Sequence, residues 1–166
     1  MVVRSAQNVV FGHNDLQPGN VLVNETTHEL TLIDFEYARS VPRGYDIING
    51  WCEWAADYHG PTPHLMNYNT FPTLEQQQLF ALHYLTEMKR SNASASVVGS
   101  VVSKEEIEHV IQEARHFEQL SHLWWGVWSL LQATQSSIDF NYIGYGKCRL
   151  DQLNRRLIQE DEEKKQ

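Results

Sequence analysis

The sequence predicts an α+β domain in which a small β-hairpin region is followed by a body made almost entirely of helices. The order of the elements carries this prediction, because strand patterns stop near residue 35 and helix patterns begin near residue 46. The early runs are short, β-branched and bounded by polar turns, as strands are. The later apolar residues recur at three- and four-residue spacing, which is typical of one face of a helix.

Three strands are expected, at residues 9–11, 20–24 and 29–35. The first is a β-branched and aromatic run that ends at Gly12. The second and third lie on either side of the polar turn "ETTH", so we expect them to pair as a hairpin. The chain then becomes irregular, because Pro42 and Gly44 interrupt any regular pattern.

Helices are expected at residues 46–58, from about 74 to 90, at 104–136 and at 147–159. Thr73 with Gln76, and Ser103 with Glu106, have the spacing of a capping box, which satisfies unpaired backbone groups at a helix start. Residues 142–146 are expected to form a turn. The third helix carries the expected core stripe, which consists of Ile107, Val110, Ile111, Ala114, Phe117, Leu120, Trp124, Trp128 and Leu131.

These elements make up one domain over residues 1–166. Its expected parts are the loop region 1–46, the helical segment 47–90, the connection 91–103, the helical segment 104–160 and the tail 161–166. The connection "SNASASVVGSVVS" is built of small residues, so we expect it to be flexible.

Composition and charge exclude several classes of function. The formal net charge of -8, without a basic cluster, argues against a nucleic-acid partner. No apolar run approaches the length of a membrane span, and the start of the chain lacks the apolar region of a signal peptide. Cys52 and Cys148 lie far apart in unrelated contexts, so we expect free thiols and a reducing, cytoplasmic location.

The stretch "FGHNDLQPGN" concentrates polar side chains between two strands. Asp15 and Asn20 lie five residues apart with Pro-Gly between them, and Asp34 follows the hairpin. Two carboxylates and an amide on such loops can hold Mg²⁺, and an Asp can orient a hydroxyl for phosphoryl transfer. Each residue alone is more simply a turn residue or a strand-end cap. The three together, at this spacing, favour a catalytic site.

The same segments resemble the choline/ethanolamine kinase family, whose relatives are the aminoglycoside phosphotransferases and the eukaryotic-like kinases. The resemblance rests on "HNDLQPGN" and "LIDFEYA", and it continues in "RGYDIINGWCEW", "SHLWWGVWSLLQ" and "IDFNYIGYGKCRLD". It implies the mostly helical C-terminal lobe of a protein-kinase-like fold. It also implies ATP- and Mg²⁺-dependent phosphorylation of choline or ethanolamine, an early reaction of phospholipid synthesis.

The resemblance also implies roles for individual residues. Asp15 would be the base that accepts the substrate's hydroxyl proton. Gln17 and Asn20 would contact phosphate or metal. Asp34 would be the chief Mg²⁺ ligand and a phosphate neighbour, with Glu36 close by. His13 is expected to support the loop, because a lone histidine is more often a structural group than a ligand.

A second set of residues is implied for the substrate. A quaternary ammonium donates no N–H hydrogen bond, so it is best held by aromatic faces near a carboxylate. The matching positions are Tyr37, Glu53, Tyr58, Trp125, Trp128 and Tyr145. The alternative is that the tryptophans are core residues. That alternative is favoured for Trp124, which continues the apolar stripe.

The N-terminal lobe that the family uses to hold ATP is not expected in this sequence. There is no Gly-x-Gly-x-x-Gly pattern, and the first lysine is Lys89. We therefore expect the first strand and the nucleotide side of the loop to be exposed. Two functions stay open: the catalytic lobe of a kinase, and a non-catalytic module that binds choline or a partner subunit. The sequence also leaves open whether the chain forms a homodimer.

Overall fold

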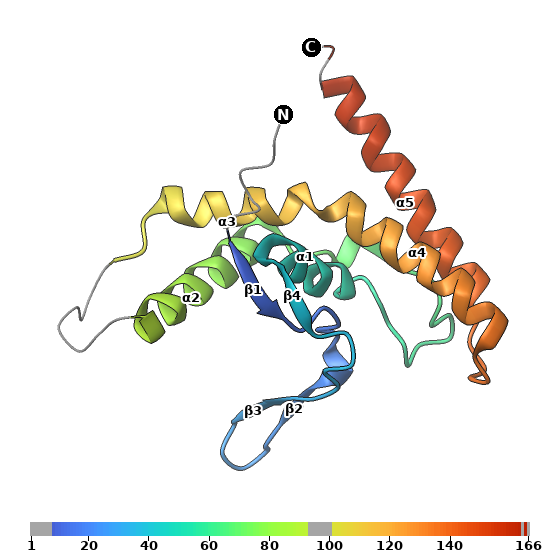
Figure 1. The fold of residues 1–166 in the computed structure, drawn as a ribbon, viewed down its shortest axis with the longest axis horizontal. Coiled ribbons are helices and arrows are strands. Elements are labelled where there is room, and N and C mark those ends of the chain that lie inside the picture. The colour runs from blue at the N-terminus through green and yellow to red at the C-terminus, as the bar shows by residue number, and fades with distance from the viewer. Residues whose placement is uncertain (1–7, 93–100, 164, 166) are drawn as a thin grey trace.

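The computed structural model describes residues 8–92, 101–163 and 165, and these have the α+β architecture that the sequence predicts. Two small antiparallel sheets lie on one side of a body of helices (Figure 1). The β2–β3 hairpin projects from that body, and α1 lies at its centre (Figure 1). The elements are β1 Val9–Gly12, β2 Val21–Val23, β3 Leu30–Leu32, β4 Arg39–Pro42, α1 Arg43–Glu53, α2 Leu74–Asn92, α3 Lys104–His116, α4 Glu118–Gln135 and α5 Tyr142–Glu163.

The hairpin is confirmed, but the chain after it is more regular than predicted. Strands β2 and β3 pair in antiparallel fashion, with Val21 opposite Leu32. Strand β4 was missed; it pairs with β1, so that Val10 faces Val41 across the sheet. Pro42 does not prevent this, because it is the last residue of the strand and a proline there needs no ladder N–H.

Helix α1 is the core helix of the molecule. It begins three residues before the predicted start and ends at Glu53, five residues before the predicted end. Ile47, Ile48, Trp51 and Cys52 are all buried against α2 and α3. The helix also holds the loop after β1, because Asp46 of α1 accepts a hydrogen bond from the N–H of Asn14.

The predicted long helix is in fact two helices. The chain leaves helical geometry at Phe117, whose φ and ψ are -95° and 0°, between α3 and α4. Val110, Ile111 and Ala114 in α3 are buried as predicted, and Ile107 and Phe117 pack against them.

The core stripe predicted for the second half is only partly confirmed, because Trp128 packs partly buried against the cluster that contains Trp125 but the other predicted positions do not. Leu120, Trp124 and Leu131 are exposed, Trp124 at 39%, whereas Trp125 beside it is 6% exposed. The break at Phe117 rotates the helix relative to a continuous one, so a different face meets the core. Instead, the Arg39 guanidinium lies over the Trp124 ring, with its central carbon 4.7 Å from the ring centroid.

Helix α5 begins at Tyr142, so the predicted turn at 142–146 is its first turn. Gly146, one of the two glycines in the predicted turn, serves close packing against α4 instead. A Cβ on Gly146 would collide with Ser129 Oγ, and one on Gly126 would lie 2.8 Å from Leu150. Small residues therefore let α5 run back close along α4 (Figure 1).

Both predicted capping boxes are present. Ser103 Oγ accepts from the N–H of Glu106, and the Glu106 carboxylate accepts from the N–H of Ser103 at 2.8 Å. Thr73 and Gln76 make the same reciprocal pair. Of the predicted connection, residues 91 and 92 belong to α2, residues 93–100 lie outside the described part of the chain, and Ser103 caps α3.

Three further expectations concern the exposure of the strands, the state of the cysteines and the helices that could cross a membrane. In β1, Val9 and Phe11 are exposed as expected, Phe11 at 73%, whereas Val10 is half-buried and Gly12 is buried. The apolar side chains of the hairpin are also exposed, except that of Val21, which is half-buried. Cys52 and Cys148 are free thiols, as predicted. Within the described residues, every helix is too short or too polar to cross a membrane.

A buried ion pair joins α1 to α3. Arg43 Nε donates to the Glu113 carboxylate at 2.9 Å, and both side chains are almost fully buried. Beside them, the helices approach so closely that a Cβ on Gly44 would lie 2.5 Å from the Glu113 carbonyl oxygen.

Replacing Glu113 by Ala is expected to lower the free energy of unfolding by about 3 kcal/mol, because it leaves the Arg43 charge buried without a partner. The measurement is urea unfolding. Glu87→Ala is the control, since its pair with Arg90 is exposed and should contribute less than about 1 kcal/mol. Equal losses in the two variants would contradict a structural role for the buried pair.

Candidate active site

The loop after β1 brings Asp15 and Asn20 together, as their spacing predicts. A single 3-10 turn, Pro18–Asn20, bends the chain, and Gln17 caps it by accepting from the N–H of Gly19. The Asn20 amide then donates to the Asp15 carbonyl oxygen at 2.8 Å and to its carboxylate at 3.0 Å. The carboxylate is therefore held in place by a side chain from the same loop.

His13 occupies the supporting position that the sequence predicts. Its Nδ1 accepts from the N–H of Asp15 at 3.3 Å, so the ring proton lies on Nε2, which donates to the Ile33 carbonyl at 2.9 Å. The ring also contacts Phe35, with 4.6 Å between centroids. The buried histidine thus connects the Asp15 loop to the segment that carries Asp34.

Asn14 holds the loop in a strained conformation. Its φ of 62° is in the left-handed region, which is uncommon for a residue other than glycine. Its N–H donates to the Asp46 carboxylate at 2.7 Å, and its amide donates to the carbonyls of Gly12 and Tyr37. These contacts compensate for the strain and hold the backbone on the N-terminal side of Asp15 in place.

Asp34 has the same left-handed backbone, with a φ of 63°. Its side chain is exposed, and its loop is tied to the first one because Ile33 donates its N–H to the Asn20 carbonyl at 3.0 Å. The negative charge of Asp34 is close enough to contribute to a raised pKa at Asp15. The two motifs therefore lie side by side, although 14 residues separate Asn20 from Asp34.

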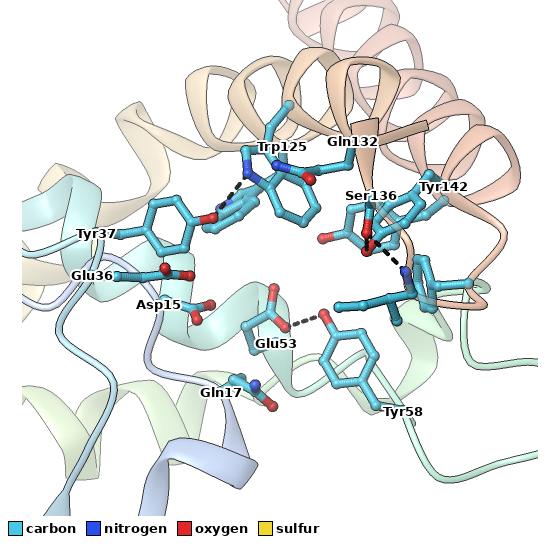
Figure 2. A pocket seen from close by; sticks show the side chains of 14 residues that line it. Asp15, Gln17, Glu36, Tyr37, Glu53, Tyr58, Trp125, Gln132, Ser136 and Tyr142 are labelled. Carbon is cyan, nitrogen blue, oxygen red and sulfur yellow. Dashed lines mark hydrogen bonds between the residues drawn. The ribbon is translucent and has the colours of Figure 1, made fainter. Parts of the chain in front are cut away.

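A cavity of about 570 Å³ opens beside Asp15 (Figure 2). It brings together nine of the residues singled out in the sequence: Asp15, Gln17, Glu36, Tyr37, Glu53, Tyr58, Trp125, Trp128 and Tyr145. Asn20 and Asp34 do not line it. The carboxylates of Asp15 and Glu36 lie at one side of the cavity beside Tyr37, and Trp125, Tyr142 and Tyr58 lie along other parts of its wall (Figure 2).

The aromatic wall is an interlocked set of rings. Trp125 and Trp128 meet edge to face at 5.2 Å, and Tyr37 meets Trp125 at 5.4 Å. Trp128 Nε1 donates to the Tyr37 hydroxyl at 3.0 Å, which fixes both rings. Such a wall presents electron-rich faces to the cavity, which is the environment that attracts a cation.

Glu53 supplies a carboxylate at the floor of the cavity. It is 4% exposed, and it accepts a hydrogen bond from the Tyr58 hydroxyl at 2.6 Å (Figure 2). Burial raises the pKa of Tyr58 well above its usual value, so this hydroxyl keeps its proton and remains a donor. Tyr145 from α5 is buried beside them.

Five lining residues were missed in the sequence: Gln132, Ser136, Ile138, Phe140 and Tyr142. They come from the end of α4, from the connection that follows it, and from the first residue of α5, and of these only Tyr142 lay in the predicted turn. The aromatic residues of "IDFNYIGY" were the available signal, because Phe140 contacts both Tyr142 and Tyr145. Their placement depends on the helix pair α4–α5, which brings residue 132 and residue 142 to the same wall (Figure 2).

The electrostatics of Asp15 suit a proton acceptor. Its pKa is raised from 3.8 to about 6, first by burial and second by the negative charge of Glu53, while the hydrogen bond from Asn20 acts in the opposite direction. At neutral pH the carboxylate is therefore ionised, and its affinity for a proton is greater than that of an ordinary aspartate.

The loops also offer oxygen ligands for a metal ion. Within the described residues, no three carboxylate, histidine or cysteine side chains gather as a complete metal site. Mg²⁺ does not require one, because it keeps several waters and commonly takes one or two carboxylates together with substrate phosphates. The exposed carboxylate of Asp34, next to Asn20, has the chemistry that such a site needs.

Comparison with known proteins places this chain beside one family. The model of the family described as choline/ethanolamine kinase matches residues 1–154. A probable choline kinase of Arabidopsis thaliana is 38% identical over 150 residues, which is 90% of this chain and 40% of that protein. A choline/ethanolamine kinase of Homo sapiens is 41% identical, over 85% of this chain and 36% of that protein.

Solved structures give the same result. An ethanolamine kinase of Plasmodium vivax superposes with a TM-score of 0.71 at 31% identity, over 90% of this chain and 35% of its own. A choline kinase of Cryptosporidium parvum superposes with a TM-score of 0.72 at 26% identity, over 95% of this chain and 41% of its own. The chain thus spans 35–41% of the length of these four proteins.

Proposed function

This chain belongs to the choline/ethanolamine kinase family, and from that premise we propose that its site serves the transfer of a phosphoryl group from ATP to the hydroxyl of choline or ethanolamine. One observation carries the proposal: a single cavity joins the carboxylate of Asp15 to an aromatic wall with a buried carboxylate, Glu53. The products would be ADP and phosphocholine or phosphoethanolamine.

In the proposed reaction the substrate hydroxyl lies against Asp15. The hydroxyl oxygen attacks the terminal phosphorus of ATP, its proton passes to the Asp15 carboxylate, and ADP leaves with the electrons of the broken bond. The hydrogen bonds from Asn20 and from Asn14 to Asp46 keep the loop, and so the carboxylate, in position.

Asp34 and Asn20, with Glu36 at the cavity edge, are the residues that would hold Mg²⁺. The ion would offset the negative charge of the nucleotide phosphates. Gln17 and Asn20 would contact those phosphates from the 3-10 turn. The exposure of Asp34 supports this role, because a carboxylate that is to meet a metal–nucleotide complex must be open to it.

The aromatic wall and Glu53 would receive the ammonium end of the substrate. Choline fits this wall better than ethanolamine does, because a quaternary ammonium gains from ring faces and a primary ammonium needs hydrogen-bond acceptors. We therefore expect the chain to bind choline more tightly than ethanolamine. Isothermal titration with the two ligands tests this, and equal affinities would contradict it.

A direct test of the function separates catalysis from binding. The purified chain is incubated with ATP, Mg²⁺ and choline, and phosphocholine is measured; choline binding is measured in parallel by calorimetry. Turnover that requires Asp15 supports the proposed function. Choline binding without turnover would reject catalysis by this chain and favour the second candidate, a module that binds choline without phosphorylating it. If the chain neither binds choline nor phosphorylates it, both candidate functions are rejected.

A further inference from the structure

A buried arginine lies directly behind the cavity wall. Arg149 in α5 has no exposed surface, and it is not itself a lining residue. Its Nη1 approaches Glu53 Oε1 at 3.4 Å, and its guanidinium lies 5.8 Å from the centre of the Tyr145 ring. It therefore contacts two wall residues from the side that faces away from the cavity.

The second terminal nitrogen of the guanidinium is held by helix α4. Arg149 Nη2 donates to Ser121 Oγ at 3.0 Å, and Ser121 donates onward to the side chain of Asn49 at 2.5 Å. All three side chains are buried. This branch thus runs from α5 through α4 to Asn49 of α1, the helix that also carries Glu53, while Nη1 of the same guanidinium faces the Glu53 carboxylate.

The charges around the cavity explain why Glu53 needs a cationic partner. Glu53 and Asp15 are close enough for the charge of Glu53 to raise the pKa of Asp15, and a buried carboxylate is costly without a partner. Tyr58 offers Glu53 a neutral hydrogen bond only. Arg149 is the cation that contacts Glu53 among the described residues.

We propose that Arg149, held by Ser121, is a positioning residue that offsets the negative charge of Glu53 and fixes its carboxylate for the cationic end of the substrate. This rests on the proposed function, in which Glu53 receives the ammonium. Two electrostatic effects compete, because Arg149 also repels a bound cation. The effect on Glu53 is expected to dominate, because without Arg149 the buried carboxylate would lose its cationic partner and would no longer be held toward the substrate cation.

The test compares choline with its uncharged carbon analogue, 3,3-dimethylbutan-1-ol. Both have the same shape and hydroxyl, so the ratio of their dissociation constants measures the preference for charge alone. Binding can be followed by tryptophan fluorescence, because Trp125 and Trp128 line the cavity. In Arg149→Met we expect choline to bind about tenfold more weakly and the alcohol to bind as before. A merely structural role would weaken both ligands together.

Arg156→Met is the matched control. Arg156 lies seven residues further along α5 and pairs with Glu118 at 2.7 Å, away from the cavity. The substitution Arg156→Met should lower the melting temperature and leave the ratio of the two dissociation constants unchanged. Arg149→Lys and Ser121→Ala keep the test decisive if Arg149→Met does not fold. Each variant should reduce the preference for choline over the neutral alcohol. The reduction should be smaller in Ser121→Ala, because that variant retains the guanidinium of Arg149.

The outcomes separate this inference from the proposed function. If the unmodified chain binds choline no better than the neutral alcohol, the proposed cation pocket is wrong. If it prefers choline and the folded Arg149 variants keep or increase that preference, the pocket stands and the positioning role of Arg149 is overturned. A selective loss of choline binding in these variants, with Arg156→Met unaffected, establishes the role.

Discussion

Replacing Asp15 by Asn is expected to slow phosphoryl transfer by about 10² to 10⁴-fold, the range typical for loss of a general base. Asparagine has the same shape and still accepts the hydrogen bond from Asn20, so the loop should keep its conformation. It cannot accept the substrate proton. The measurement is phosphocholine formation, with binding of ATP and choline determined separately to show that both ligands still bind.

The same substitution is expected to stabilise the fold at pH 8. The pKa of Asp15 is about 6 in the folded protein and 3.8 as the ordinary value, so the folded state binds the proton more tightly. The stability contributed by this group is full below about pH 3.8 and is lost as the pH rises through about 6. Removing the charge should therefore recover about 1 to 2 kcal/mol at pH 8, after allowance for solvent screening, and nothing at pH 4.

Asp151→Asn is the control for both measurements, because Asp151 is an exposed residue of α5 far from the cavity lining. Its turnover and its melting temperature should match those of the unmodified chain at every pH. In the unmodified chain, turnover should fall as the pH drops below about 6, since the base becomes protonated. Retained turnover in Asp15→Asn would remove Asp15 from the role of base.

Replacing Trp128 by Ala is expected to raise the dissociation constant for choline by about tenfold or more. The change removes a ring face, which contributes about 1 to 2 kcal/mol to holding a desolvated cation. It also removes the N–H that fixes the Tyr37 hydroxyl, so a second ring of the wall becomes free to move. Calorimetric titration with choline measures the effect.

Trp124→Ala provides a matched control on the same helix. Trp124 is as large as Trp128, but it points away from the cavity and contacts Arg39. Its removal should leave choline binding unchanged. ATP binding should change little in either variant. Equal losses for choline and ATP in Trp128→Ala would count against an aromatic site for the cation.

The features predicted best from the sequence are those that depend on contacts between residues close together in the chain. The two capping boxes and the β2–β3 hairpin depend on residues within a few positions of one another, and all three are present. Strand β4 was missed because its partner β1 lies about 30 residues earlier, so no local pattern revealed the pairing. The first turn of α5 was missed because glycines at helix contacts resemble glycines of turns.

The sequence by itself determined the chemistry of the loops, because Asp15 and Asn20 are close along the chain and Asp34 follows a hairpin that returns it to them. The tertiary structure decided which faces of α4 and α5 meet the cavity. The break at Phe117 turns Trp125 inward and Trp124 outward. The close contact of α4 with α5 buries Arg149 behind Glu53, from nearly a hundred residues away, and only three-dimensional packing can create such a neighbour.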